Sequence, residues 1–168
     1  NVAHRGFIAD QWGVPRERLA ATAKMKNDGY AIGMMERALK GGDDLVAAMF
    51  LIYTTHINLP ETNTLVRPAL EKMFVIAQEI YRHAPNNLYA DVIFPAATWG
   101  EVGGVYVQSE RRLYVTDKAA EPPAGCKPDL DIVIDKGKEI GHLLGLDVDK
   151  MYPYEKNEQG FYKVEDVF

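Results

Sequence analysis

Cysteine is almost absent from this chain, with one residue in 168. Cys126 therefore cannot form an intramolecular disulfide, and it cannot supply the four thiolates that bind an iron–sulfur cluster. It stands in a turn rich in proline and glycine, with no histidine or second cysteine near it in sequence, so we interpret it as a loop thiol. No iron–sulfur cluster and no metal site is expected within these residues.

Long apolar runs and clustered positive charge are also missing. The longest apolar run, residues 45–53, is too short to cross a bilayer as a helix, so membrane insertion is not expected. The formal net charge is −5 and the basic residues are scattered, which argues against nucleic acid and anionic membranes as partners. A composition of 47% hydrophobic and 26% charged residues is typical of a soluble globular domain. We expect residues 1–168 to form one such domain, and the sequence leaves both periplasm and cytoplasm open.

Motifs of several common enzyme classes do not occur. The chain has no Ser-His-Asp order, no Gly-rich loop ahead of Lys-Ser and no His-Glu-x-x-His pattern, so nothing supports a hydrolase or a nucleoside triphosphatase. The Gly-rich stretch 100–104 precedes a β-rich run, whereas a phosphate-binding loop would lead into a helix N-terminus. We therefore do not interpret this stretch as a phosphate site.

The chain does contain an alternation of strand-like and helix-like segments. Apolar β-rich runs predict strands, and amphipathic or well-capped runs predict helices. In chain order the predicted elements are helices at 15–23 and 30–40, a strand at 45–53, a helix at 63–72, a strand at 73–77, a second crossover at 80–89, a strand at 91–94, an antiparallel hairpin at 105–108 and 113–116, and a long helix at 128–144.

This order predicts an α/β fold with a mostly parallel, Rossmann-like doubly wound sheet, flanking helices and a small antiparallel hairpin. The continuous apolar run at 45–53 suits a strand that is buried on both faces, as in parallel sheets. In the long helix, one set of apolar side chains is expected to face the sheet: Ile132, Val133, Ile140, Leu143 and Leu144.

Ligands of such sheets bind beyond the carboxyl ends of the strands. Loops begin there at 54–58, 78–79 and 96–104, so we expect their polar groups to converge on one crevice. Glu79 would accept hydrogen bonds from ribose hydroxyls, and the alternative is that it caps the following turn. Asp129 and Asp131 lie in the first turn of the long helix, where carboxylates also suit the helix dipole.

Residues 90–130 contain a specific succession of motifs. An apolar strand leads into Pro-Ala-Ala, then Glu101 and a glycine pair, then the triplet Glu110-Arg111-Arg112, and finally Pro-Pro and Pro128-Asp129. This succession resembles the bis-molybdopterin guanine dinucleotide oxidoreductases of the DMSO-reductase type, most of all the catalytic subunits of periplasmic nitrate reductases. The resemblance covers most of the chain, from Trp12-Gly-Val-Pro to 164–168, and implies that the chain is one domain of a longer catalytic subunit.

The resemblance also implies which residues bind the cofactor. Asp129 matches a family position at which an Asp contacts the guanine. Gln78 and Glu79 match a Ser-Asp pair on one dinucleotide, which preserves an acidic acceptor. His56 and Asn58 both overlap an Asn-rich cofactor loop, and the register between them stays open.

The resemblance also implies two further cofactor-binding candidates, Glu101 in the loop and Arg111 in the charged triplet. From spacing alone, the triplet could equally be the solvated end of an ordinary hairpin. One departure stands beside them, because Val102 occupies the place where periplasmic nitrate reductases carry a Lys after the Glu. A cationic partner for phosphate or pterin is lost there, and this puts nitrate itself in doubt as the substrate.

The implied function is that of a cofactor-binding domain in a molybdenum or tungsten oxidoreductase that reduces an oxyanion by oxygen-atom or electron transfer. The 168 residues would carry no catalytic residue and no activity alone. A 4Fe-4S cluster would lie in the rest of the parent chain, and the partners would be that rest, an electron-transfer subunit or small redox protein, and a small oxyanion. Residues 147–168 would connect to the next domain.

Two other functions remain open from the sequence. A formate dehydrogenase-type or oxyanion-oxidase catalytic subunit shares the same domain plan. A relative that has lost the cofactor and serves as a structural or docking subunit belongs to a different class, and the acidic residues at positions 79 and 129 argue against it.

Overall fold

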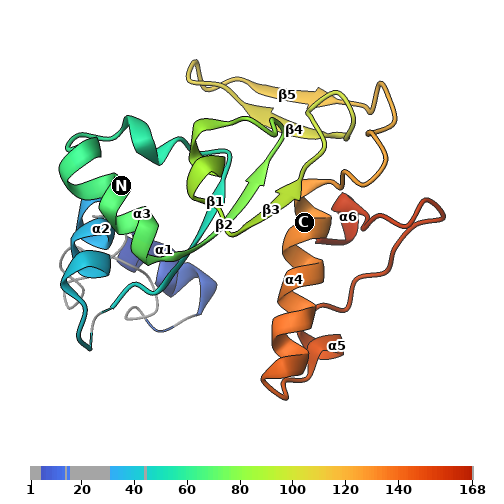
Figure 1. The fold of residues 1–168 in the computed structure, drawn as a ribbon. Helices are drawn as coiled ribbons and strands as arrows, with labels where there is room; N and C mark the ends of the chain where they lie inside the picture. The colour runs from blue at the N-terminus through green and yellow to red at the C-terminus, as the bar shows by residue number, and fades with distance from the viewer. Residues whose placement is uncertain (1–4, 14, 16–30, 44, 168) are drawn as a thin grey trace. The chain divides into compact units, whose positions relative to one another are not determined.

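A computed structural model describes residues 5–13, 15, 31–43 and 45–167, and Figure 1 shows their path. The described chain separates into two compact units. The first unit comprises Asn1–Ala77 and Pro85–Val92, and the second comprises Gln78–Ala84 and Ile93–Phe168. The helix predicted at 15–23 lies outside the described residues.

The strands form two sheets, which confirms the α/β class. Three parallel strands lie in the order β1-β2-β3, with bounds Ala48–Ile52, Phe74–Glu79 and Val92–Pro95. Strands β4 (Gly104–Val107) and β5 (Leu113–Thr116) pair as the predicted antiparallel hairpin. Pro95 ends β3, as expected of a residue that cannot donate to a sheet ladder.

The first unit has a core that its helices share with β1 and β2. Helix α2 (Ala31–Lys40) ends at Gly41 and Gly42, whose φ angles of 71° and 85° favour glycine. A π-helical turn, η4 (Thr62–Val66), continues directly into α3 (Arg67–Lys72), so the predictions at 30–40 and 63–72 are confirmed. The buried core cluster consists of Met35, Ala38, Met49, Leu51, Leu65, Val66, Ala69, Leu70, Met73 and Val75.

Two predictions in this part of the chain are wrong. Strand β1 is buried on one face only, because Phe50 and Ile52 are 39% and 41% exposed while Met49 and Leu51 are buried. The crossover at 80–89 is no α-helix: it consists of a turn followed by the short 3-10 helix η5 (Pro85–Tyr89). Pro85 and the two asparagines after it favour tight turns over a regular helix. The remaining short helices of the first unit are α1 (Arg5–Trp12) and η3 (His56–Asn58).

The second unit is built around α4 (Asp129–Leu143), followed by α5 (Val148–Met151) and α6 (Val164–Val167). Helix α4 starts after Pro128 and stops before Gly145, whose φ is 68°, as the sequence predicts. Its buried face is different from the predicted one. Ile132 is buried, but Val133, Ile140, Leu143 and Leu144 are 43–86% exposed, and the other buried positions are Asp131, Ile134 and Gly141.

Two glycines let the chain after α4 return closely along the helix. A Cβ atom at Gly141 would lie 2.5 Å from Cγ1 of Val148, and one at Gly137 would lie 2.5 Å from the hydroxyl of Tyr152. Real Cβ atoms essentially never come that near a neighbour. Gly137 therefore lowers the helix propensity of α4 in exchange for close packing of the returning segment.

Asp131 anchors the end of that returning segment. The carboxylate is 1% exposed, and its Oδ1 accepts a hydrogen bond of 3.0 Å from the backbone N–H of Tyr162. Its Oδ2 is buried and has no hydrogen-bond partner among the described residues. Burial raises the pKa of Asp131, and the hydrogen bond from Tyr162 only partly opposes this effect. Asp131 is therefore a buried acid that the fold holds at some electrostatic cost.

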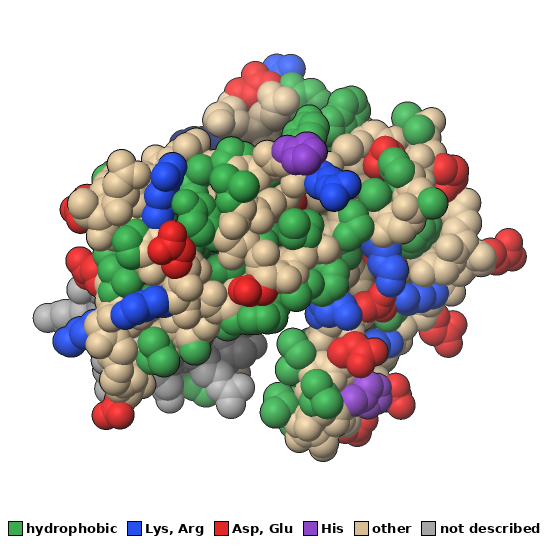
Figure 2. Space-filling model, viewed as in Figure 1, with side chains coloured by type: hydrophobic (Ala, Val, Ile, Leu, Met, Phe, Trp, Pro, Cys, Tyr) green, Lys and Arg blue, Asp and Glu red, His purple; other side chains and the backbone are tan. Residues whose placement is uncertain are grey.

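Asp135 lies one turn further along α4 in a different electrostatic setting. Its two oxygens bind Lys127 at 2.8 Å and Lys156 at 2.9 Å, and the Tyr162 hydroxyl donates to it at 3.2 Å. Burial acts to raise the pKa of Asp135, but the hydrogen bonds from the two lysines outweigh it and hold the pKa below its usual value. Figure 2 shows basic and acidic side chains lying next to one another on the right of the view.

We expect the substitution Asp131→Asn to stabilise the fold at neutral pH. The amide keeps the oxygen that accepts from Tyr162 and removes a charge whose burial raises the carboxyl pKa. A raised pKa in the folded state costs stability as pH rises through that pKa, so the gain should be present at pH 7 and vanish below the pKa of the unfolded chain, about 4. Chemical denaturation between pH 3 and pH 8 measures it.

Asp135→Asn is the matched control with the opposite sign. It removes two ion pairs to partly exposed lysines and should lower the free energy of unfolding at pH 7 by about 1 kcal/mol. Because the folded pKa of Asp135 is depressed, this loss should shrink as pH falls through that pKa. Equal effects of the two substitutions at all pH values would contradict the assignment.

Candidate functional site

The seven residues predicted to bind a cofactor fall in both units. His56 and Asn58 belong to the first unit, in η3. The other five belong to the second unit: Gln78, Glu79, Glu101, Arg111 and Asp129. The described structure brings two of these five into direct contact.

A line of backbone hydrogen bonds places three segments of the second unit side by side. The N–H of Ala96 donates to the carbonyl of Glu79 at 3.2 Å, which joins the ends of β2 and β3. Lys127 N–H donates to Pro95 at 3.2 Å, and Ala97 N–H donates to Lys127 at 2.9 Å, which forms a parallel bridge just before α4. The first turn of α4 is thereby held next to the last residues of β2.

Gln78 and Asp129 meet across this junction. The side-chain amide of Gln78 donates a short hydrogen bond to Oδ1 of Asp129, over 51 residues of sequence. Gln78 is fully buried, and its Oε1 has no hydrogen-bond partner within the described part of the chain. The opposite orientation of the amide would set its oxygen against the carboxylate, so the donating orientation is the favourable one. Asp129 is partly exposed in the first turn of α4, where the helix dipole favours its charge.

Glu79 lies at the end of β2, where the sequence predicts the start of a loop. Its Oε1 accepts a hydrogen bond of 2.9 Å from the N–H of Ile80, the residue that follows. This contact is the local cap that the sequence leaves open as the alternative role of Glu79. One carboxylate oxygen is thus engaged by the protein's own backbone.

Glu101 is held by its own loop and borders a small pocket. Its Oε2 accepts a hydrogen bond of 2.8 Å from Thr98 N–H, while its N–H donates to the carbonyl of Thr98 at 2.9 Å. The pocket has a volume of about 130 Å³, and both Val102 and Lys118 line it. Lys118 therefore supplies this pocket with a cation, whereas Val102 supplies none. Comparison of the sequence by position does not find Lys118.

Arg111 stands in the turn between β4 and β5. Its backbone adopts the left-handed conformation with φ of 62°, and its N–H donates to the carbonyl of Gln108 at 2.9 Å. The side chain is exposed. The backbone therefore gives Arg111 a turn-forming role, and its guanidinium points outward from a tight hairpin end.

In the first unit, Asn86 fixes the loop that carries His56 and Asn58. Its side-chain amide donates to the carbonyl of Thr54, and its Oδ1 accepts from Ile57 N–H at 3.4 Å. Asn86 is 4% exposed and comes from η5, 28 residues after Asn58. The sequence gives no signal for this role beyond an Asn-Asn pair after a proline.

Burial lowers the pKa of His56, and a hydrogen bond with the Thr54 backbone opposes this only in part. The imidazole is therefore neutral at pH 7 and can both donate and accept a hydrogen bond. Asn58 is exposed at the end of η3. The loop thus offers uncharged hydrogen-bonding groups.

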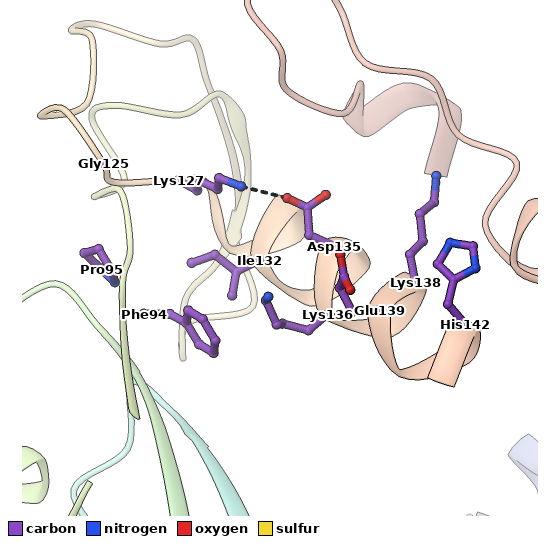
Figure 3. Close-up of a pocket in the computed structure, with 10 residues that line it drawn as sticks. All are labelled: Phe94, Pro95, Gly125, Lys127, Ile132, Asp135, Lys136, Lys138, Glu139 and His142. Carbon is purple, nitrogen blue, oxygen red and sulfur yellow. Dashed lines mark hydrogen bonds and ion pairs between the residues drawn. The ribbon is translucent and has the colours of Figure 1, made fainter. Parts of the chain in front are cut away.

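The larger cavity of the second unit contains none of the seven predicted residues. It measures about 490 Å³ and lies along α4. Figure 3 shows Lys127 paired with Asp135 on one side and Lys136 beside Phe94, whose ring centroid is 5.2 Å from the lysine nitrogen. Lys127 and Asp135 thus engage each other, and Lys136 lies against an aromatic ring. We place the candidate site instead at Gln78 and Asp129, where a buried acceptor has no donor among the described residues.

The described residues offer neither a metal-binding cluster nor a membrane-spanning helix. These contain no group of three or more His, Cys, Asp or Glu side chains that could hold a metal ion. They also contain no helix long and apolar enough to cross a membrane. Cys126 is a free, partly exposed thiol.

A protein-family model and several curated proteins match this chain. The family model described as molybdopterin oxidoreductase matches residues 16–135. A nitrate reductase of Symbiobacterium thermophilum is 33% identical over 144 residues, and the periplasmic nitrate reductase of Desulfovibrio desulfuricans is 32% identical over 144 residues. Each match covers 84% of this chain and 18% of the relative.

A relative with a different printed activity also matches. Formate dehydrogenase H of Escherichia coli is 30% identical over 141 residues, which cover 83% of this chain and 18% of the relative. The chain thus spans less than a fifth of the length of these curated relatives. The family model covers well over half of the chain, and its span contains both Gln78 and Asp129. The chain therefore belongs to the molybdopterin oxidoreductase family.

Proposed function

We propose that this chain is a cofactor-binding domain in the catalytic subunit of a molybdenum or tungsten bis-pterin oxidoreductase that reduces an oxyanion. The family, together with relatives named as nitrate reductases, supports this proposal. The observation on which it rests most directly is the contact between Gln78 and Asp129 at the end of β2. This contact lies at a strand end, where sheets of α/β proteins bind ligands.

The acceptors at this position suit the donor edge of guanine, as the guanine dinucleotide form of the cofactor requires. Guanine presents an N1–H and an exocyclic amine as adjacent donors. Asp129 offers carboxylate oxygens, of which Gln78 engages only Oδ1, and an oxygen can accept more than one hydrogen bond. The Oε1 of Gln78, which has no hydrogen-bond partner among the described residues, is a further acceptor in the same place. The residues present therefore fit a guanine base held by Asp129, with Gln78 fixing the carboxylate.

The other predicted residues have supporting roles in this proposal. Glu79 would accept from ribose hydroxyls with the carboxylate oxygen that Ile80 does not engage. Glu101, His56 and Asn58 would contribute hydrogen bonds, and Arg111 a charge toward the cofactor. The bound cofactor supplies the oxygen-atom or electron-pair transfer, and this chain binds and orients one nucleotide arm.

We further propose a domain plan for the parent protein. Residues 1–168 would form one Rossmann-like, doubly wound domain, and residues 147–168 would lead toward the next one. The rest of the catalytic subunit would hold a 4Fe-4S cluster and the metal-site residues, and an electron-transfer subunit or small redox protein would be its partner. The length of the relatives supports this plan, because the matched segment is 18% of each.

A formate dehydrogenase-type catalytic subunit is the second candidate. The specific observation in its favour is the 30% identity to formate dehydrogenase H. Val102, which stands where the nitrate reductase pattern carries a Lys, also weakens the case for nitrate, because the cation of the Glu101 pocket comes from a different position, Lys118. Both candidates require the same cofactor, so they separate only by substrate.

Elemental mass spectrometry of the full-length protein, with pterin fluorescence and nucleotide release, tests the proposal. We expect molybdenum or tungsten together with two guanosine monophosphate equivalents for each metal atom. A native preparation that contains neither metal nor pterin would instead identify a cofactor-free structural relative. Cytidine or adenosine nucleotides in place of guanosine would reject the role assigned to Asp129.

The substitution Asp129→Asn should loosen the guanosine arm. It replaces one acceptor oxygen by a donor amine that opposes the guanine donors, and a bidentate base contact contributes about 1–3 kcal/mol. We expect cofactor loss from the full-length protein to become roughly 5- to 150-fold faster. Asp131→Asn is the control, because Asp131 lies in the same helix turn but binds Tyr162. Equal release from both variants would argue against base recognition by Asp129.

Gln78 should act through Asp129, and a double-substitution experiment tests this. Gln78→Met preserves size and removes the donor that engages Oδ1 of Asp129. We expect it to accelerate cofactor release several-fold in the wild-type background and to add little in the Asp129→Asn background. An equal additional effect in both backgrounds would show that Gln78 matters only for packing.

A further inference from the structure

The hairpin of the second unit has one face made entirely of aliphatic side chains. Val105 pairs with Val115, and Val107 pairs with Leu113, so these four residues project from the same face. They are exposed by 61%, 80%, 70% and 66%, respectively. We call this set the aliphatic face.

The opposite face of the hairpin carries two tyrosines whose hydroxyls bind groups of the second unit. Tyr106 and Tyr114 pair there and are less exposed than the aliphatic residues. The Tyr106 hydroxyl donates to the Trp99 carbonyl at 3.3 Å, and the Tyr114 hydroxyl donates to Glu110 at 2.6 Å. The hairpin therefore has one face with polar contacts and one aliphatic face that stays exposed to solvent among the described residues.

Charged residues are confined to the end of the hairpin. Glu110, Arg111 and Arg112 are exposed in the turn, and none of the four positions of the aliphatic face is polar. In Figure 2 hydrophobic side chains lie beside charged ones at the top of the view, where Figure 1 places the hairpin. An apolar centre with charge at its edge is the usual composition of a protein interface.

A two-stranded hairpin with such a face is unfavourable in water. Isolated hairpins are marginally stable and need packing on a hydrophobic face to persist. Apolar patches of roughly 300–600 Å² are already the largest on typical monomers, and they often mark interaction sites. We therefore expect the aliphatic face to pack permanently against another apolar surface.

We infer that the aliphatic face is an internal interface of a longer polypeptide, covered by an apolar surface of a domain outside these 168 residues. The family match at 16–135 includes the hairpin, and the relatives carry more than four fifths of their length beyond the matched segment. The inference rests on the proposed domain plan. It adds which surface of this domain meets the rest of the chain.

The chemistry of the aliphatic face favours a domain of the same polypeptide over a partner that binds transiently. Permanent interfaces are more apolar than transient ones, whereas weak redox encounters are small. Steering of a mobile partner uses complementary charge. Val105, Val107, Leu113 and Val115 offer no charge and no hydrogen-bonding side chain, so the cover should be equally apolar.

Cysteine labelling of the native full-length protein tests this inference. Val107→Cys and Val115→Cys report on the aliphatic face, and Ser109→Cys in the exposed turn is the matched control. Maleimide modification of each site is followed by peptide mass spectrometry, which separates it from other cysteines. We expect modification at positions 107 and 115 to be at least about 100-fold slower than at position 109, and equal at all three sites in urea.

Three outcomes would overturn the inference. Rapid native labelling at positions 107 and 115 would show that the face is open. Protection that disappears on dilution would assign the cover to a second copy, and protection that disappears on removal of an accompanying subunit would assign it to that subunit. Hydrogen exchange of the β4 and β5 amides in the unsubstituted protein gives the same answer if a cysteine variant does not fold.

Metal and pterin content of the same samples separates this inference from the proposed function. A protected face in a cofactor-free protein would reject cofactor binding and leave the interface in place. An open face in a protein with full cofactor content would reject the interface alone.

Discussion

The backbone hydrogen bonds that run from Glu79 through Ala96 to Lys127 are the constraint on which the second unit depends. They join the ends of two strands to the segment that enters α4. Without this junction, Gln78 and Asp129, 51 residues apart in sequence, would have no reason to meet. The candidate site is therefore a product of strand-end geometry, and the side chains only complete it.

The two carboxylates at the start of α4, Asp129 and Asp131, differ in burial and therefore in the groups that they can bind. Asp129 is partly exposed and keeps acceptor capacity for a ligand, while Asp131 is enclosed and engaged by the backbone of Tyr162. Two positions in one helix turn thus separate the proposed recognition residue from a structural one. The lysines around Asp135 secure the same helix by ion pairs.

Local patterns in the sequence predict the elements well where a short-range rule decides them. Glycines at 41 and 42 end α2, Pro128 precedes α4, and two β-rich runs form the hairpin. The faces of these elements are decided by what packs against them, which no window of sequence contains. For that reason the buried side of α4 includes Asp131 and Gly141, while Ile140 and Leu143 are exposed.

The residues of the candidate site are predictable from the sequence only in part. Strand-end reasoning points to Gln78 and Glu79, and the family resemblance adds Asp129. The hydrogen bond between Gln78 and Asp129 is a long-range contact that sequence spacing does not reveal. The sequence predicts Glu79 as a ligand-binding residue or as a cap and does not decide between them. In the structure its carboxylate accepts a hydrogen bond from the next backbone N–H. Asn86 and Lys118 enter the account only through three-dimensional proximity.

The close approach at Gly137 and Gly141 has a mechanical consequence. The returning segment is fitted to the C-terminal half of α4 by Val148 and Tyr152 and tied to its first turn by Tyr162 and Asp131. A pull on this segment is therefore transmitted along the helix axis to the turn that carries Asp129. Movement of the chain around residue 162 would therefore displace the first turn of α4, and with it the carboxylate of Asp129.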